Sequence, residues 1–306
     1  MSAIRDRLAS SSRPDAALLL RGFGWAALAA FIFAGWFIVT RFTVTHDLTV
    51  WDVTALRFGI GAVLLAPVLV RSRNGIPARA FRDGLILAVL WGAPFVLLVA
   101  IGLQLTSAAQ ASSVTPALMP VFAGLLGWAL HGQRPGAGRL AGYAAVVAGQ
   151  AVLMASAAMA AGTVPSPAGI VVLILAALMW AIYTHRFRRS GLSALQGTAP
   201  VCVWSAILYV PAYLLSGTTN LLTVGWRELA FQSVYQGVLM SVVAILAFNR
   251  AVALLGPAAA TAVIALLPVL TTVLAIPTLG EMPTAAGAVA VVVIGTGVFL
   301  AARPGR

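Results

Sequence analysis

Apolar stretches long enough to cross a lipid bilayer recur along nearly the whole chain. The hydrocarbon core of a bilayer is about 30 Å thick, so a spanning helix needs roughly 20 predominantly apolar residues. Charged residues make up only 8% of the 306 residues, against about 25% in a typical soluble domain. We predict ten spans, at residues 22–42, 52–70, 83–104, 110–131, 138–158, 167–185, 197–216, 228–249, 256–277 and 283–302.

Helices are expected in these spans because lipid offers the backbone no hydrogen-bond partners. Only helices and closed barrels satisfy the backbone there, and barrel strands are short segments of alternating hydrophobicity, which this sequence lacks. The sequence therefore predicts an all-α integral membrane protein. The polar residues 1–21 are expected to form an N-terminal tail, followed by an uncleaved spanning helix rather than a signal peptide.

The basic residues indicate how the spans are oriented. The chain has 19 basic residues, all of them arginine, and 7 acidic ones. If the N-terminus is cytoplasmic, all arginines except Arg41, Arg57 and Arg227 fall in inner loops and tails. Such a bias is typical of bacterial inner-membrane proteins. We therefore expect both termini in the cytoplasm, membrane lipids around the spans, and no nucleic-acid partner.

An internal repeat divides the chain into two halves. Residues 117–121 (Ala-Leu-Met-Pro-Val) match 265–269 (Ala-Leu-Leu-Pro-Val), which follow 148 positions later, and the turns at 132–135 and 280–283 match in the same register. Each half then holds five spans. Because five is odd, the second half is expected to be inverted relative to the first. Carriers built from inverted repeats bind substrate near the membrane midplane, between the repeats.

The predicted domains are a first repeat at 22–158 and a second, inverted repeat at 167–302, enclosing a central cavity. Both halves are already joined in one chain, so a monomer is expected to be the functional unit. Gly138, Gly142 and Gly149 share one face of the fifth span. Small residues at such spacing let helices pack closely, either as an internal seam or as an oligomer contact.

Several of these motifs resemble those of a known family. The Asp52-x4-Arg57-Phe58 opening of span two, the two Ala-Leu-x-Pro-Val blocks and the Gly-Gln/Glu-x-Pro turns are similar to the ten-helix EamA-type branch of the drug/metabolite transporter superfamily. Within that branch the chain most resembles YddG-type aromatic amino-acid exporters. The resemblance implies export of amino acids and related metabolites by alternating access, without a cofactor. Gln133 departs from the family motif, which carries Glu at this turn.

The acidic residues bear on how transport is driven. Buried carboxylates inside membrane spans are typical of proton relays in transporters. All seven acids of this chain lie in predicted loops or at span ends: Asp6, Asp15, Asp47, Asp52, Asp83, Glu228 and Glu281. A carboxylate-driven antiport mechanism is therefore disfavoured, and we expect a facilitator or a less obvious form of coupling. Export of drugs, nucleobases or other small solutes remains the alternative function.

Aromatic residues deep in the spans are the first candidates for a substrate site. Trp36, Trp91, Trp180 and Tyr183 lie on spans one, three and six, which line the central cavity in the proteins that this chain resembles. Aromatic rings suit apolar or aromatic side chains. The alternative for each ring is packing against lipid.

Polar residues inside the spans are the second set of candidates. Ser113, Tyr235 and Ser241 are expected to turn toward protein or water and are predicted to bind the ammonium and carboxylate of an amino acid. The alternative is hydrogen bonding between helices or to the helix's own backbone. Arg57 is expected to reach the membrane surface or to pair with Asp52, so a structural role is favoured for it over the alternative of substrate binding.

Prolines are predicted to interrupt spans three, four and nine. Proline removes a backbone donor and kinks a helix, and Pro94, Pro120 and Pro268 are predicted to act in gating. Other classes fit less well. A membrane enzyme needs a buried cluster of acidic or histidine side chains, and an ion channel needs charge rings or a carbonyl filter. The sequence shows none of these, and neither a metal nor catalysis is expected.

Overall fold

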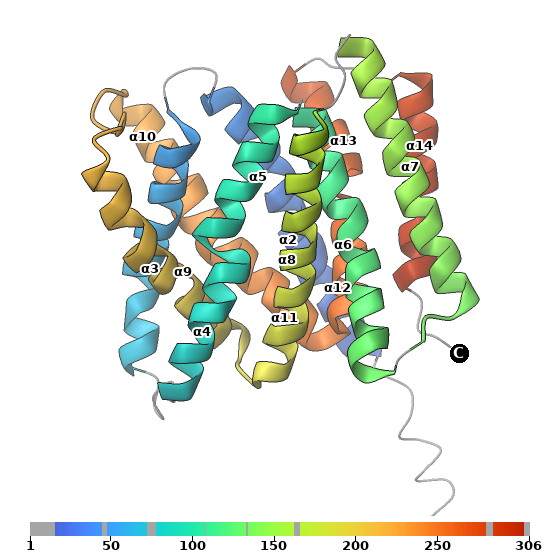
Figure 1. Cartoon of the computed structure of the whole chain (residues 1–306), viewed down its shortest axis with the longest axis horizontal. Helices are drawn as coiled ribbons and strands as arrows, with labels where there is room; N and C mark the ends of the chain where they lie inside the picture. Colours follow the sequence, from blue (N-terminus) through green and yellow to red (C-terminus); the bar gives the residue numbers. More distant parts are fainter. Residues whose placement is uncertain are drawn as a thin grey trace, which may run out of the picture.

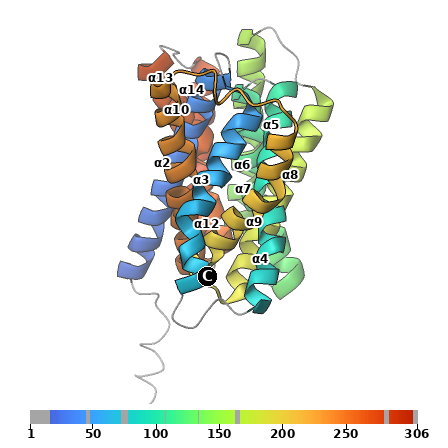
Figure 2. The same cartoon turned by 90° about the vertical axis from the view of Figure 1, so that its left-hand side faces the viewer.

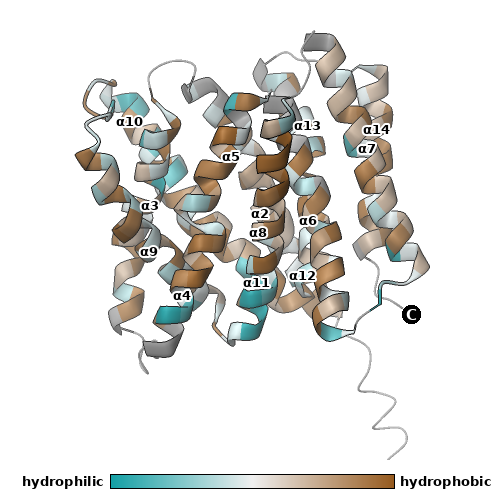
Figure 3. Ribbon diagram, in the orientation of Figure 1, coloured by the Kyte–Doolittle hydropathy of each residue, from teal (hydrophilic) through white to brown (hydrophobic). Residues whose placement is uncertain are grey.

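The computed structural model describes residues 16–44, 48–71, 78–106, 108–132, 134–161, 166–279 and 284–302. Throughout this part of the chain the regular structure is helical and no strand occurs, which confirms the predicted all-α fold. The helices run side by side as one bundle (Figure 1), and the view turned by 90° shows the same arrangement (Figure 2). Hydrophobic residues dominate the helices, whereas hydrophilic residues gather at the lower ends of α4 and α8 (Figure 3).

The first half of the chain contains α2 (Ala16–Val44), α3 (Val50–Arg71), α4 (Ala78–Trp91), α5 (Ala93–Leu105), α6 (Ala108–His131) and α7 (Ala137–Ala161). The second half contains α8 (Pro167–Ser190), α9 (Ala194–Leu215), α10 (Trp226–Gln232), the π-helix η1 (Ser233–Ala244), α11 (Ile245–Leu255), α12 (Pro257–Ile264), α13 (Leu267–Leu279) and α14 (Ala285–Ala302).

These elements form the ten spans that the sequence predicts. In the described part of the chain, nine helical stretches are long and apolar enough to cross a membrane, and a tenth, shorter apolar helix covers Ala285–Ala301. Each coincides with a predicted span to within a few residues. Helices that span a membrane contain few charged residues, so hydropathy alone locates them well.

Helix packing shows that the second half is an inverted copy of the first. α2 packs against span eight (η1 and α11) and span nine (α12 and α13), and α8 packs against span three (α4 and α5) and span four (α6) in the same way. α3 (span two) packs against α9 (span seven), and α7 (span five) packs against α14 (span ten). In both pairs the two helices hold the same position in their respective halves. α2 starts at the lower end of the bundle and α8 starts at the upper end (Figure 1). The inverted five-helix repeats are therefore confirmed.

Two of the spans with expected proline interruptions are broken, and one is not. Span three breaks at Gly92, with Pro94 in the first turn of α5, and span nine breaks at Ala265, with Pro268 in the first turn of α13. The predicted interruption of span four is wrong, because α6 continues through Pro120. A membrane helix tolerates a proline when neighbouring groups and small local adjustments satisfy the freed carbonyl.

Span eight has an irregularity that the sequence did not predict. Between α10 and α11 the chain forms η1, a π-helical stretch of 12 residues. π-Helical segments are rare and often occur at functional sites. η1 packs against α3 and α2, so it contributes to the interface between the two halves.

The glycines of span five form an internal seam. A Cβ added at Gly142 would lie 2.5 Å from the backbone nitrogen of Ala301 on α14, and one added at Gly149 would lie 2.7 Å from the Ile294 side chain. By contrast, a Cβ at Gly138 would meet nothing within 4 Å. Two of the three glycines thus allow α7 and α14 to approach closely, which agrees with the predicted internal seam rather than with an oligomer contact.

Candidate functional site

A cavity of about 50 Å³ lies between the two halves. Helices of both halves contribute to it: α2 to α6 from the first, and α8, η1 and α13 from the second. The residues that line it are mainly aromatic or aliphatic: Phe33, Trp36, Phe37, Arg57, Trp91, Phe95, Val96, Val99, Thr115, Pro116, Trp180, Met240 and Leu267. Trp36, Trp91 and Trp180, three of the residues predicted from sequence, are among them.

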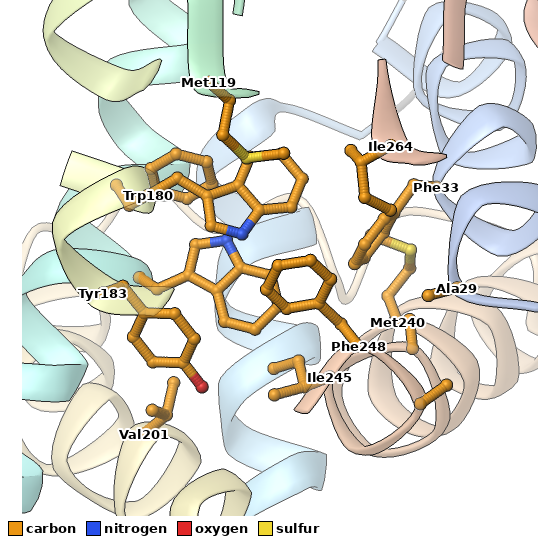
Figure 4. Close-up of a cluster of buried hydrophobic side chains, with 14 of the residues drawn as sticks. Ala29, Phe33, Met119, Trp180, Tyr183, Val201, Met240, Ile245, Phe248 and Ile264 are labelled. Atoms are coloured by element: carbon orange, nitrogen blue, oxygen red, sulfur yellow. The ribbon is translucent and has the colours of Figure 1, made fainter. Parts of the chain in front are cut away.

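An aromatic cluster forms one wall of this cavity. The rings of Trp91 and Trp180 stack with centroids 5.3 Å apart, and Phe33 meets both of them edge-on. Phe248 of α11 lies 5.0 Å from the Trp91 ring and 5.4 Å from the Trp180 ring. Figure 4 shows Phe33, Trp180 and Phe248 converging from different helices. Each such pair contributes about 0.5–1.5 kcal/mol beyond its buried area, so the cluster fastens the two halves together.

Tyr183 supports this wall from behind. Its ring lies 4.6 Å from that of Trp91, and its hydroxyl donates a hydrogen bond to Asn249 Oδ1 at 2.7 Å. Asn249 Nδ2 in turn donates to Thr198 Oγ1 at 3.1 Å. Tyr183 is fully buried and is not one of the cavity-lining residues described above. The sequence did not reveal Asn249 as its partner, because a polar residue near a span end is equally typical of a helix cap.

Trp36 is held in place by a chain of amide side chains. Its Nε1 donates to Gln236 Oε1 at 3.1 Å, and Gln236 Nε2 donates to Gln232 Oε1 at 3.2 Å. Gln232 Nε2 then donates to Glu228 Oε1 at 2.9 Å. Glu228, Gln232 and Gln236 follow one another at intervals of four along α10 and η1, so these three side chains share a face. The chain of hydrogen bonds connects the cavity wall to the upper end of span eight.

The polar candidates have backbone partners in this conformation. The Tyr235 hydroxyl donates to the carbonyl of Ile32 at 2.9 Å. The Ser241 hydroxyl donates to the carbonyl of Gly237 on its own helix. Neither side chain lines the cavity. Their hydrogen bonds match the alternative given above, in which these side chains bond between helices or to their own helix backbone. The side chain of Ser113 lies outside the described residues.

The break in span three is stabilised by a side chain of the other half. Ser205 Oγ on α9 accepts a hydrogen bond from the backbone nitrogen of Ala93 at 3.1 Å, which is otherwise a free donor at the start of α5. A Cβ at Gly92 would overlap this hydroxyl. Glycine is therefore required where the chain turns from α4 into α5. A gating role for Pro94, Pro120 and Pro268 stays a prediction.

Arg57 lies in neither of the positions expected from sequence. It is 4% exposed and lines the cavity, so it does not reach the membrane surface. Asp52 is not its partner, because the Asp52 carboxylate accepts hydrogen bonds from the backbone nitrogen of Thr49 at 2.8 Å, from the hydroxyl of Tyr213, and from the backbone nitrogen of Asn220 at 3.0 Å.

The Arg57 guanidinium carbon lies 5.4 Å from the centroid of the Phe58 ring, and Nε is buried without a hydrogen-bond partner among the described residues. Trp180 Nε1 is also buried and unpartnered. No described residue that lines the cavity carries a carboxylate. The described residues around the cavity are therefore mostly aromatic or aliphatic, carry one positive charge, and include two buried donors without a partner but no carboxylate.

This architecture defines a class of protein. Ten apolar helices in two inverted repeats around a cavity are typical of secondary transporters. The model of the EamA-like transporter family matches residues 20–155 and 167–303, once in each half. The chain belongs to this family of membrane transporters.

A solved crystal structure supports the fold. It is described only as the crystal structure of a protein, and its sequence is 23% identical to this one. The alignment covers 93% of this chain and 96% of that chain, and the two structures superpose with a TM-score of 0.70. At this identity the similarity concerns the fold alone. No curated protein sequence matches the chain.

Proposed function

We propose that the protein exports amino acids, including aromatic and other apolar ones, and related metabolites across the bacterial inner membrane by alternating access, as YddG-type exporters do. The observation that carries this proposal is that three tryptophans, Trp36, Trp91 and Trp180, line the cavity at the interface of the inverted repeats. Aromatic rings pack well on apolar side chains, and the interface of inverted repeats is where such carriers bind substrate.

The distribution of arginines supports the orientation of the protein in the membrane that this proposal assumes. The loops and helix ends at the lower end of the bundle in Figure 1 carry a series of exposed arginines. They are Arg82, Arg134, Arg186, Arg188, Arg189 and Arg250. Since basic loops remain in the cytoplasm, this end is taken as cytoplasmic, together with both chain termini.

Transport requires the cavity to expand. A cavity of about 50 Å³ has room for a few water molecules, which is less than most amino acids need. The breaks at Gly92 and Ala265 and the π-helix η1 interrupt regular hydrogen bonding in three spans that line the cavity. These are the places where spans three, eight and nine are expected to bend when the cavity opens.

Counterflow in proteoliposomes tests the proposed function. Vesicles loaded with unlabelled tryptophan, phenylalanine or leucine are expected to accumulate the labelled amino acid transiently, because a carrier exchanges its substrate across the membrane. Vesicles without protein serve as the control. If no amino acid exchanges above this control, the leading proposal is wrong. Exchange of nucleobases or planar drugs in its place would favour the alternative, since flat aromatic walls also stack on such rings.

A further inference from the structure

Arg57 is a buried cation that the fold does not neutralise. Its side chain is 4% exposed, and no ion pair with a described residue offsets its charge. An unpaired charge inside a membrane protein is costly, and intramembrane charges mostly mark substrate or ion pathways. Here the charge borders the cavity between the repeats, which is where a transported molecule can supply the missing counter-ion.

The other polar groups of the cavity indicate which chemistry is missing. Trp180 Nε1 is a second buried donor without a partner. Two other donors are already used, since Trp36 Nε1 donates to Gln236 and the Thr115 hydroxyl donates to the carbonyl of Leu173 at 3.1 Å. Buried donors without acceptors cost free energy that an incoming acceptor recovers. The cavity thus favours a ligand that brings hydrogen-bond acceptors and negative charge.

We propose that Arg57 binds the carboxylate of the transported molecule, and that Trp180 Nε1 donates to a ligand acceptor in the same cavity. This inference rests on the proposed function and names the group of the amino acid that is recognised. Guanidinium and carboxylate form charge-assisted, often bidentate hydrogen bonds. The aromatic wall then receives the side chain, and the ring faces attract the ammonium group.

The same arrangement rejects cations that lack a carboxylate. An amine without its carboxylate brings positive charge next to Arg57, and no carboxylate among the described lining residues compensates for it. Specificity of this kind relies on repulsion as well as attraction. The aromatic wall by itself would accept carboxylates and organic cations equally. The structure therefore assigns to Arg57 the selection of amino acids and other carboxylates over organic cations.

Competition in wild-type proteoliposomes tests this assignment without any substitution. Counterflow of labelled tryptophan is measured against unlabelled tryptophan, indole-3-propionate, tryptamine and tryptophanamide. Tryptophan and indole-3-propionate, which carry a carboxylate, are expected to compete. Tryptamine and tryptophanamide lack it and are expected to compete at least roughly 30-fold more weakly, as when one partner of a buried charge pair is lost.

Substitutions at Arg57 form the second arm. Arg57→Gln is expected to slow tryptophan counterflow at least roughly 30-fold and to remove the preference for carboxylates over tryptamine. Arg57→Lys, which keeps the charge without the planar fork, is expected to restore that preference in part. The matched control is Arg227→Gln, since Arg227 is exposed at the upper end of span eight; its counterflow is expected to equal that of the wild type.

The outcomes separate this inference from the proposed function. If amino acids exchange but tryptamine competes as strongly as tryptophan, or if folded Arg57→Gln keeps the wild-type rate and preference, the assignment of Arg57 is overturned while amino-acid export stands. If no amino acid exchanges at all, the proposed function is wrong and the inference falls with it. Should Arg57→Gln fail to fold, the wild-type competition alone decides.

Discussion

Replacing Trp91 with alanine is expected to destabilise the protein by roughly 3–5 kcal/mol and to abolish transport. Trp91 is 1% exposed and its ring contacts those of Phe33, Trp180, Tyr183 and Phe248. These partners come from α2, α8 and α11, so removal of the indole leaves a void where the two halves meet. Because each neighbour is held by other contacts, the void cannot collapse without moving the cavity wall.

The measurement is the midpoint of thermal unfolding of the detergent-purified protein, followed by counterflow in proteoliposomes. Trp226→Ala is the matched control, because Trp226 is 74% exposed at the start of α10. Its unfolding midpoint in detergent is expected to stay close to that of the wild type. Equal midpoints for Trp91→Ala and the wild type would show that the cluster does not hold the halves together.

Replacing Asp52 with alanine is expected to cost roughly 3–5 kcal/mol, because hydrogen bonds to a charged group contribute about 1.5–3 kcal/mol each and the carboxylate accepts several of them. Asp52 is fully buried and forms a capping box with Thr49: Thr49 Oγ1 accepts from the Asp52 nitrogen at 3.3 Å, and the Asp52 carboxylate accepts from the Thr49 nitrogen at 2.8 Å. This arrangement fixes the start of α3. The same carboxylate holds the Tyr213 hydroxyl of α9 and the nitrogen of Asn220.

Alanine at this position therefore removes the acceptor shared by the Thr49 nitrogen, the Tyr213 hydroxyl and the Asn220 nitrogen. Thermal unfolding is again the measurement. Asp52→Asn, which keeps one acceptor oxygen, is expected to lie between alanine and the wild type. Asp83→Ala in the second turn of α4, where the side chain is only half-buried, is expected to unfold at the same temperature as the wild type. If Asp52→Ala and Asp83→Ala unfold alike, the capping network contributes little.

Most of the fold could be predicted from the sequence because two strong patterns determine it. The length of the apolar stretches locates the spans, since bilayer thickness allows few alternatives. The 148-residue offset between the two Ala-Leu-x-Pro-Val blocks implies two equal halves, and their odd number of spans implies inversion. Local departures were less predictable. Proline breaks span nine near Pro268 but not α6 at Pro120, because neighbouring groups decide whether the freed carbonyl is satisfied.

The site was predictable only in part, because lateral packing decides which face of a helix meets the cavity. The three tryptophans were found because they lie deep in spans that line the cavity in the proteins that this chain resembles, and aromatic rings suit apolar substrates. Arg57 was misjudged, since its distance from the span end is compatible with reaching the membrane surface. Gln236 and Asn249 were not recognised as supports for the ring positions, because their partners lie on helices distant in sequence.

The central claim is that the cavity between the repeats is a passage reached alternately from both sides of the membrane. Its most direct test is the labelling of a single cysteine at a cavity-lining position. Cys202, which is fully buried in α9, is first replaced by alanine, and Met240→Cys or Thr115→Cys is then introduced. A membrane-impermeant thiol reagent is applied from each side, with and without excess tryptophan.

The account predicts that the cavity cysteine reacts from both sides and that excess tryptophan slows the reaction. Val63→Cys, on the exposed apolar face of α3 with 74% of its side chain accessible, is expected to face lipid and to remain unlabelled. In a variant that still transports, a cavity cysteine that reacts from one side only, or that tryptophan fails to protect, would contradict the account.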